Sequence, residues 1–280
     1  MNKALSEIII CIKGAGEMAS AVAWRLYRAH FRRIFMLEVP RPLAVRRRVA
    51  FSEAIYTDCQ TIEAVTAVKS IDITAVTTAW EKGHIAVLVD PGGEIIATLQ
   101  PDVIIDAILA KQNLGTRLTQ APLVIGLGPG FDAGQDVHTV IETNRGHDLG
   151  RIITSGRAQP NTGIPGSIAG YTRQRVLRAP RGGQFETRMD IGRPVKIGDG
   201  IGTVDGQAVC AEIDGVLRGL VRSGIKVPRN MKLGDIDPRG NAAYCDTLSD
   251  KARAISGSVL EAVLRKFMAP FDPEAAEKIG

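Results

Sequence analysis

Apolar and polar residues alternate along the first part of the chain with the rhythm of an α/β protein. Residues 7–12 (EIIICI) form a short β-branched run that is typical of a buried strand. Apolar side chains then recur at helical spacing, at Ala19, Val22, Ala23 and Leu26. A second aliphatic run covers residues 34–37 and ends in Glu38. The pattern predicts a strand, a turn, a helix and a second strand.

The turn after the first strand carries the spacing of a dinucleotide-binding fingerprint. It comprises Gly14, Ala15, Gly16, Glu17, Met18 and Ala19. In such a turn Gly14 permits the tight bend, Gly16 lets backbone approach a pyrophosphate, and small Ala19 lets the helix pack closely. Glu38 would accept hydrogen bonds from ribose hydroxyls. These features predict a Rossmann-like nucleotide-binding domain over residues 1–120, unless the glycines serve only the turn.

Two aspartates end later aliphatic runs of the same part. Asp90 follows residues 86–89, and Asp106 follows residues 103–105. Because parallel sheets bind ligands at the carboxyl ends of their strands, both are candidates for the nucleotide site. Asp90 also begins a Pro-Gly turn, which would explain it equally well. A helix is expected over residues 41–56.

The pattern changes after residue 120 to short β-branched runs, which predict a second, β-rich domain over residues 121–280. A strand there runs into a glycine cluster that includes Gly128 and Gly130, and no helical stripe follows it. Residues 179–208 match residues 211–240 at a shift of about 32, with glycines at corresponding bends. This duplication resembles a barrel-sandwich hybrid, or hammerhead. The stretch joining the halves has no lysine, so a covalent carrier is not expected. A C-terminal helix is predicted over residues 249–267.

Composition narrows the class of ligand. The chain has a net charge of +5, 45% hydrophobic residues and only 5% aromatic residues. Eight arginines lie within residues 25–48, Arg41 among them. Because few aromatic side chains are available for stacking on bases, a phosphate-bearing small molecule is expected rather than nucleic acid.

The same composition bears on location and metals. The longest aliphatic run, residues 85–89, is too short to cross a bilayer, so no membrane association and a cytoplasmic location are expected. The four cysteines form no CxxC pair, and no metal site is expected. The oligomeric state stays open, with a homo-oligomer as one outcome.

Several polar residues of the second half are candidates for catalysis. His138, Glu142, Arg145 and His147 lie in a predicted hairpin and would carry out acid–base work or hold an anion. Polar hairpin loops also arise for solubility alone. Cys245 precedes the last predicted helix, where a thiolate would be favoured, although a core cysteine is the alternative.

Long segments of the chain resemble a known family. They include IKGAGEMASAVAWRL, DAILAKQNLGT, PLVIGLGPGFDAGQDVHTVIETNRGHDLGRII, PNTGIPG and YCDTLSDKARAI. The chain resembles the YqeB-type accessory proteins of the selenium-dependent molybdenum hydroxylase system and, more distantly, the XdhC/CoxI maturation factors. The resemblance implies a role in equipping a molybdenum site. It also implies a molybdenum hydroxylase and selenium or molybdenum cofactor maturation proteins as partners.

Three hypotheses follow from the sequence. The first is a maturation factor that binds NAD or a molybdopterin dinucleotide on the turn at residues 14–16. In this hypothesis the arginine cluster, or the Gly126–Gly130 loop together with Arg145, contacts further phosphates. The second is an NAD-dependent oxidoreductase in which His138, Glu142 or His147 transfers protons. The third is a non-enzymatic interaction platform for the hydroxylase.

Overall fold

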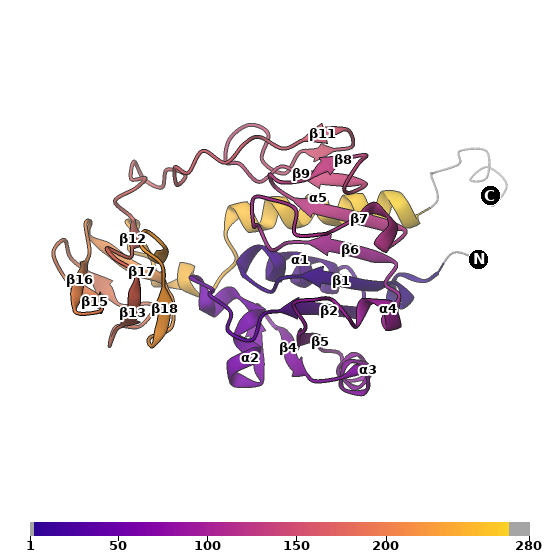
Figure 1. Ribbon diagram of the computed structural model, residues 1–280, viewed down its shortest axis with the longest axis horizontal. Coiled ribbons are helices and arrows are strands. Elements are labelled where there is room, and N and C mark those ends of the chain that lie inside the picture. Colours follow the sequence, from indigo (N-terminus) through magenta and orange to yellow (C-terminus); the bar gives the residue numbers. More distant parts are fainter. Residues whose placement is uncertain (1–2, 269–280) are drawn as a thin grey trace, which may run out of the picture.

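Nine strands form one mixed sheet at the centre of the computed structural model, which describes residues 3–268 (Figure 1). The strand order is β10-β9-β7-β6-β1-β2-β5-β4-β3. The strands are β1 (Ile9–Lys13), β2 (Arg33–Glu38), β3 (Cys59–Ile62), β4 (Val65–Ser70), β5 (Ile85–Val89), β6 (Val103–Asp106), β7 (Leu123–Leu127), β9 (Thr139–Ile141) and β10 (Ile152–Ile153). All neighbours pair in parallel except β3 with β4 and β10 with β9.

Helices cover both faces of this sheet. They are α1 (Glu17–Arg28), α2 (Ala54–Thr57), α3 (Ile73–Glu81), α4 (Ile96–Leu99) and α5 (Asp250–Phe267), with short 3-10 turns η1 (Leu5–Glu7), η2 (Arg47–Val49), η3 (Phe51–Glu53), η4 (Leu118–Gln120) and η5 (Ala242–Cys245). Alternate residues of β1 face opposite layers: Ile10 and Ile12 join the core under α1 and α5, while Cys11 joins the core under α3. Strands buried on both faces therefore read as unbroken apolar runs.

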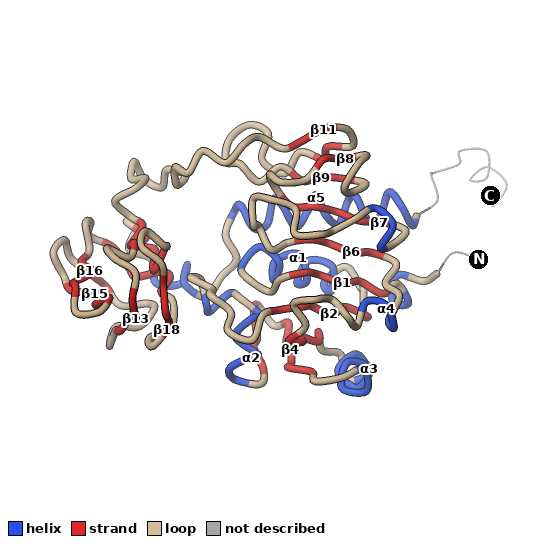
Figure 2. The backbone as a smooth tube through the Cα atoms, viewed as in Figure 1, coloured by secondary structure: helices blue, strands red, loops and turns tan. Residues whose placement is uncertain are grey.

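Residues 176–237 form a second unit, which we call the β-body; the mixed sheet, its helices and the two-stranded sheet β11-β8 are the main body. The β-body consists of two four-stranded antiparallel sheets, β12-β19-β17-β14 and β16-β15-β13-β18. Its strands are β12 (Val176–Arg178), β13 (Gly183–Glu186), β14 (Pro194–Val195), β15 (Gly200–Val204), β16 (Gln207–Cys210), β17 (Gly215–Leu220), β18 (Ile225–Val227) and β19 (Lys232–Asp237). The remaining strands are β8 (Asp132–Ala133) and β11 (Gly156–Arg157). Residues 158–175 connect the two bodies without helix or named strand (Figure 2).

Equivalent glycines in the β-body make equivalent close approaches. Gly183 and Gly215 both have φ of +157°, and a Cβ at either position would collide with an aspartate, Asp205 or Asp237 respectively. Gly183 lies against the Asp205 carboxylate and Gly215 against the Asp237 carbonyl oxygen, so each position has room only for hydrogen. Each sheet takes strands from both halves of the segment, and their apolar side chains, Phe185 and Leu217 among them, share one core.

The predicted architecture, a Rossmann-like domain followed by a β-rich domain with a barrel-sandwich hybrid, is wrong. The sheet does not end with the first 120 residues: β7 adds in parallel to β6, and β9 and β10 extend it further. The structure is one large mixed sheet accompanied by separate small antiparallel sheets. The physical reason lies in β7, whose five residues are all buried and so need a layer on each face.

A second correction concerns residues 41–56, which form two 3-10 turns and the four-residue helix α2 instead of one helix. Side chains of this segment contact the β-body. Arg47 donates to the Leu220 carbonyl oxygen at 2.7 Å, and Arg48 donates to the Ile191 carbonyl oxygen. These tertiary contacts outweigh the helical preference of the segment.

Candidate functional site

A cavity of about 690 Å³ opens at the carboxyl ends of β1, β2, β5 and β6. We call it the strand-edge cavity. Its lining residues include Lys13, Gly14, Gly16, Glu17, Met18, Glu38, Arg41, Asp90, Asp106, Thr116 and Gln120. The structure thus brings together most of the predicted cofactor-binding positions. Ala15 and Ala19 are instead fully buried beneath the turn.

The glycine turn has the backbone that its sequence requires. Gly14 has φ of +89°, and a Cβ there would lie 3.3 Å from the Ala107 carbonyl oxygen. Its amide donates to the Leu37 carbonyl oxygen at 2.7 Å, which ties the turn to β2. Gly16 is the N-cap of α1, and no side chain caps that helix. The helix therefore directs first-turn amides and a partial positive charge at the strand-edge cavity.

Glu38 lies at the end of β2 and closes one side of the strand-edge cavity. One of its carboxylate oxygens accepts the Ala15 amide at 3.0 Å, and the other accepts the Val39 amide at 2.7 Å. Burial raises the pKa of this carboxyl, while the two amides oppose the shift. Because each carboxylate oxygen can accept a second hydrogen bond, Glu38 keeps the capacity to receive a ligand hydroxyl.

A polar network in the same cavity joins the predicted Asp106 to three side chains that sequence reasoning missed. Lys13 donates to the Thr116 hydroxyl at 2.8 Å and to the Gln120 side-chain oxygen at 3.1 Å. The Thr116 hydroxyl in turn donates to Asp106 at 2.6 Å. Burial lowers the pKa of Lys13, and Asp106 opposes that shift. Because Lys13 lies at the carboxyl end of β1, its position in the sequence could have identified it as a site residue. Thr116 is distant in sequence from β1, and no sequence pattern pointed to it.

Asp90 serves the turn that follows it. Its carboxylate accepts the amides of Gly93, Glu94 and Ile95 at 2.9–3.1 Å. The alternative interpretation, in which Asp90 organises a Pro-Gly turn, accounts for these contacts. Asp90 also lines the strand-edge cavity, so it shapes the wall from which ligand contacts would come.

The rim of the strand-edge cavity is apolar and exposed. Val39, Leu43, Ile108 and Leu114 are 44%, 47%, 45% and 58% exposed. Large aliphatic side chains left in water around a concave site mark a place where an apolar surface binds.

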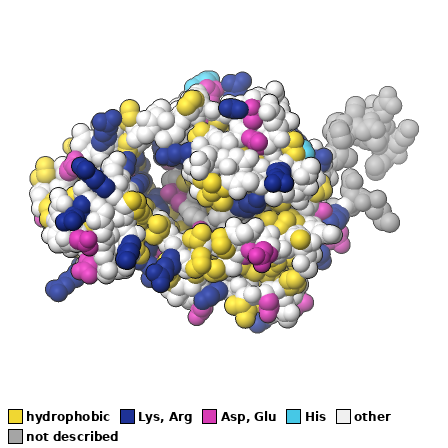
Figure 3. Space-filling model, viewed as in Figure 1, with side chains coloured by type: hydrophobic (Ala, Val, Ile, Leu, Met, Phe, Trp, Pro, Cys, Tyr) yellow, Lys and Arg dark blue, Asp and Glu magenta, His cyan; other side chains and the backbone are white. Residues whose placement is uncertain are grey.

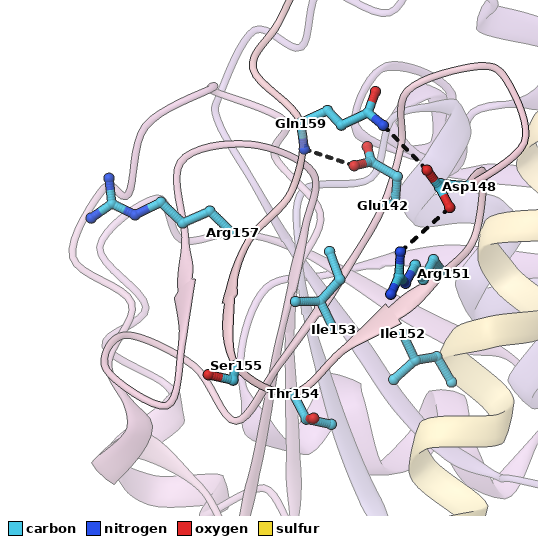
Figure 4. Close-up of a pocket in the computed structure, with 9 residues that line it drawn as sticks. All are labelled: Glu142, Asp148, Arg151, Ile152, Ile153, Thr154, Ser155, Arg157 and Gln159. Atoms are coloured by element: carbon cyan, nitrogen blue, oxygen red, sulfur yellow. Dashed lines mark hydrogen bonds and ion pairs between the residues drawn. The ribbon is translucent and has the colours of Figure 1, made fainter.

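The structure does not gather the predicted catalytic residues at this cavity. The Nδ1 atom of His138 accepts the Val124 amide at 3.0 Å, and burial lowers the pKa of the imidazole. Glu142 is buried, and its oxygens accept the amides of Asn144 and Gln159, both at 2.7 Å. It lines a separate hollow of about 390 Å³ beside Asp148 and Arg151 (Figure 4). No hydrogen bond joins His138 to Glu142.

The other three candidates are also dispersed. Arg145 forms a two-pronged ion pair with Asp250 at 2.7 and 3.0 Å, whereas His147 is exposed. Cys245 is the last residue of η5 and precedes helix α5, as the sequence predicts. It is buried, and burial raises the pKa of its thiol, so the expected thiolate is not favoured there. Within residues 3–268 no three His, Cys, Asp or Glu side chains cluster as a metal site would require.

The loop after β7 packs against protein. Gly128 has φ of +79° and Gly130 has φ of +112°; a Cβ at Gly130 would lie 2.6 Å from the Gln112 amide nitrogen. Neither residue lines the strand-edge cavity. Gly128 packs closely against the Thr143 side chain and Gly130 against the backbone of residues 111–112, which explains both glycines without a ligand.

Together, the mixed sheet and the strand-edge cavity define an α/β protein with a ligand cavity at the carboxyl edge of its strands. The sequence matches no protein-family model. It is 48% identical over 256 residues to the "Uncharacterized protein YqeB" of Escherichia coli (strain K12), and the match covers 91% of this chain and 47% of that protein. The two chains are homologues, and this chain spans about half the length of that curated relative.

Solved structures show only distant likeness. TcdA (CsdL) is 13% identical with a TM-score of 0.29, over 92% of this chain and 89% of that one. An aspartoacylase family protein from Mesorhizobium loti is 13% identical with a TM-score of 0.23, over 76% and 58% of the two chains. At such TM-scores the likeness carries no information on activity. None of the helices among the described residues has the length and apolar character needed to cross a membrane.

Proposed function

We propose that this protein binds a nucleotide in the strand-edge cavity and acts as an accessory factor for a selenium-dependent molybdenum hydroxylase. The observation that carries the binding proposal is the meeting of four features at one cavity. These are the uncapped N-terminus of α1, the Gly14 turn, Glu38 and an exposed apolar rim. The helix end suits a phosphate, Glu38 suits a ribose hydroxyl, and the rim suits a heterocycle.

Glu38 also predicts a preference among nucleotides. Its carboxylate lines the strand-edge cavity, and if it holds a ribose 2′-hydroxyl, a 2′-phosphate there would meet a like charge. NAD or a molybdopterin dinucleotide fits this wall better than NADP does. The accessory role is proposed from the resemblance of long segments of the chain to the YqeB-type accessory proteins.

The dispersion of the candidate acids and bases supports an accessory role over an oxidoreductase. His138, Glu142 and His147 do not line the strand-edge cavity. A proton-transfer group has to reach the reacting atom directly or through one water. Hydride transfer by NAD that is lost in His138→Ala would instead establish the oxidoreductase.

Gly16→Asp tests nucleotide binding with little risk to the fold. A Cβ at residue 16 meets no atom within 4 Å, its φ is −68°, and aspartate is a favourable N-cap. The new carboxylate would stand where a phosphate binds, and like charges about 4 Å apart cost about 4 kcal/mol near a protein surface. Isothermal titration with NAD should therefore show at least about a 100-fold loss of affinity.

Gly16→Asn is the matched control, because it adds the same volume without the charge. It should weaken binding far less than Gly16→Asp does. Absence of NAD, ATP and pterin-dinucleotide binding to the folded wild-type protein would refute the binding proposal, as would equal affinities for Gly16→Asp and wild type.

The accessory role is tested separately, by removing this protein from cells that make the hydroxylase. The purified hydroxylase should then contain less of its molybdenum cofactor by metal analysis and mass spectrometry. Restoration by wild type but not by Gly16→Asp would link the role to the cavity. Full cofactor content without the protein would refute it.

A further inference from the structure

A second, larger cavity lies between the main body and the β-body. Its volume is about 780 Å³, and we call it the basic cleft. Its walls come from the start of α1, the loop at residues 143–145, the 159–167 segment, β12, β19 and the start of α5. Figure 3 shows the hollow between the two bodies, with dark blue side chains along its walls.

The basic cleft concentrates positive charge. Eight lysine and arginine side chains line it against two acidic ones, Glu17 and Asp235. This excess is larger than the net charge of +5 of the whole chain. A concave surface with one sign of charge and low-dielectric walls strengthens the field inside it. The cleft therefore attracts anions more strongly than the rest of the surface does.

Most arginines of the basic cleft already form hydrogen bonds or ion pairs with other residues of the protein. Arg46 donates to Glu17 at 3.2 Å and to the carbonyl oxygens of Tyr244 and Thr247 at 2.8 and 2.9 Å. Arg175 and Arg218 both pair with Asp235. Burying charges without partners is costly, so these pairs hold the walls in place.

The lysines of the basic cleft form few such interactions. Among residues 3–268, the side chains of Lys111 and Lys251 have no hydrogen-bonded or ion-pair partner. Lys232 has only Asp235, with its Nζ atom 3.8 Å from the carboxylate, and its side chain is 40% exposed. Burial lowers the pKa of Lys251, and Arg145 adds to the shift. Such ammonium groups gain most from an anionic ligand.

The basic cleft adjoins the strand-edge cavity. Glu17, Met18 and Leu109 line both. A ligand held at the start of α1 can therefore extend into the cleft, or a second ligand can lie beside the first. The cationic nicotinamide of NAD⁺ would be repelled by this charge, whereas a phosphate-bearing group would be attracted.

We propose that the basic cleft binds a phosphate-bearing group of a small molecule, with two or more negative charges, held by Lys232 and Lys251 above the fixed arginines. The proposal goes beyond nucleotide binding at the strand-edge cavity. The occupant is either the phosphate end of the same nucleotide or a separate phosphorylated ligand, and both share this chemistry.

Isothermal titration with pyrophosphate tests the cleft directly. Wild type should bind pyrophosphate, and the double variant Lys232→Met/Lys251→Met should bind it about 100-fold more weakly, at about tenfold for each lysine. The matched control is Lys196→Met/Lys226→Met. It removes two exposed lysines of the β-body that lie outside the cleft, and it should change the affinity less than about threefold.

Gly16→Asp separates this proposal from the nucleotide proposal. That variant should lose NAD binding yet keep pyrophosphate affinity within about threefold. In the wild-type protein, competition between ATP and pyrophosphate would show that the cleft binds the phosphate end of the nucleotide. Simultaneous binding of both would show that the cleft binds a separate ligand. Either result supports the cleft site.

Three results would overturn the cleft proposal. The first is no pyrophosphate binding by folded wild type. The second is an equal loss of affinity in the control and the lysine double variant, with thermal unfolding confirming that both are folded. The third is that pyrophosphate does not bind, whereas a single-stranded oligonucleotide binds in a salt-sensitive way that depends on Lys232 and Lys251. That result would make the cleft a nucleic-acid surface.

Discussion

The chemistry of a single residue in this protein depends on partners that are distant in sequence. Glu142 looked like a general acid or base, but the amides of Asn144 and Gln159 occupy its carboxylate. Cys245 looked reactive, yet it lies against the core of the β-body, with its sulfur 3.9 Å from the Leu217 carbonyl oxygen. Residue type alone therefore overstates the number of reactive groups.

Cysteine alkylation provides a test at the scale of the residue. Cys59 and Cys210 are exposed, whereas Cys11 and Cys245 are buried and burial raises the pKa of both thiols. Because the thiolate is the reactive form, iodoacetamide at neutral pH should label Cys59 and Cys210 at least about tenfold faster than the other two. Peptide mass spectrometry would measure the four rates, and denatured protein is the control. Fast labelling of native Cys245 would restore it as a reactive site.

At the scale of the element, helix α5 completes the hydrophobic core that contains α1. Ser249 caps the helix by accepting the Ala252 amide at 3.2 Å and also donates to Glu17 at 2.9 Å. The apolar face of α5, which includes Ile255 and Val259, packs in the same core as α1 (Figure 1). The helix therefore stabilises the end of α1 that faces the strand-edge cavity.

Val259→Ala tests that packing. Val259 is fully buried, and removing two methyl groups from a rigid core should lower the free energy of unfolding by about 2 kcal/mol. Urea unfolding followed by tryptophan fluorescence would measure it. Glu261→Ala is the control on the same helix, since it removes only an exposed ion pair with Arg265 and should change stability by less than about 0.5 kcal/mol. Equal effects would show that α5 does not pack on α1 as described.

At the scale of the whole molecule, the arginines near the glycine turn join the two bodies. Arg47 contacts the Leu220 carbonyl oxygen and Asp190, and Arg48 contacts Asp190 and Asp246. Glu53 of the main body forms an ion pair with Arg222, which follows strand β17 of the β-body. Of the predicted arginine cluster, Arg41 lines the strand-edge cavity and Arg46 lines the basic cleft, whereas the other six arginines line neither.

Arg47→Ala tests the junction between the bodies. The substitution leaves the buried Leu220 carbonyl oxygen without its partner, which should cost about 1–3 kcal/mol. Both tryptophans, Trp24 and Trp80, lie in the main body, so fluorescence reports that body while circular dichroism reports both. The urea midpoints of the two signals should separate in Arg47→Ala. Arg33→Ala, on the exposed end of β2, is the control. Midpoints that stay together at wild-type values would contradict the role of Arg47.

The sequence by itself determined the local features that depend on neighbouring residues. Apolar periodicity located β1, α1 and β2, and positive φ at Gly14 follows from the glycine turn itself. Tertiary structure decided what depends on long-range pairing: that β7 joins the first sheet, that residues 41–56 do not form one helix, and that Lys13 meets Thr116. Local backbone preference is a property of a few adjacent residues, whereas a side chain's partner is selected by the packing of the whole chain. For that reason the sequence located the turn, and only the structure showed the basic cleft beside it.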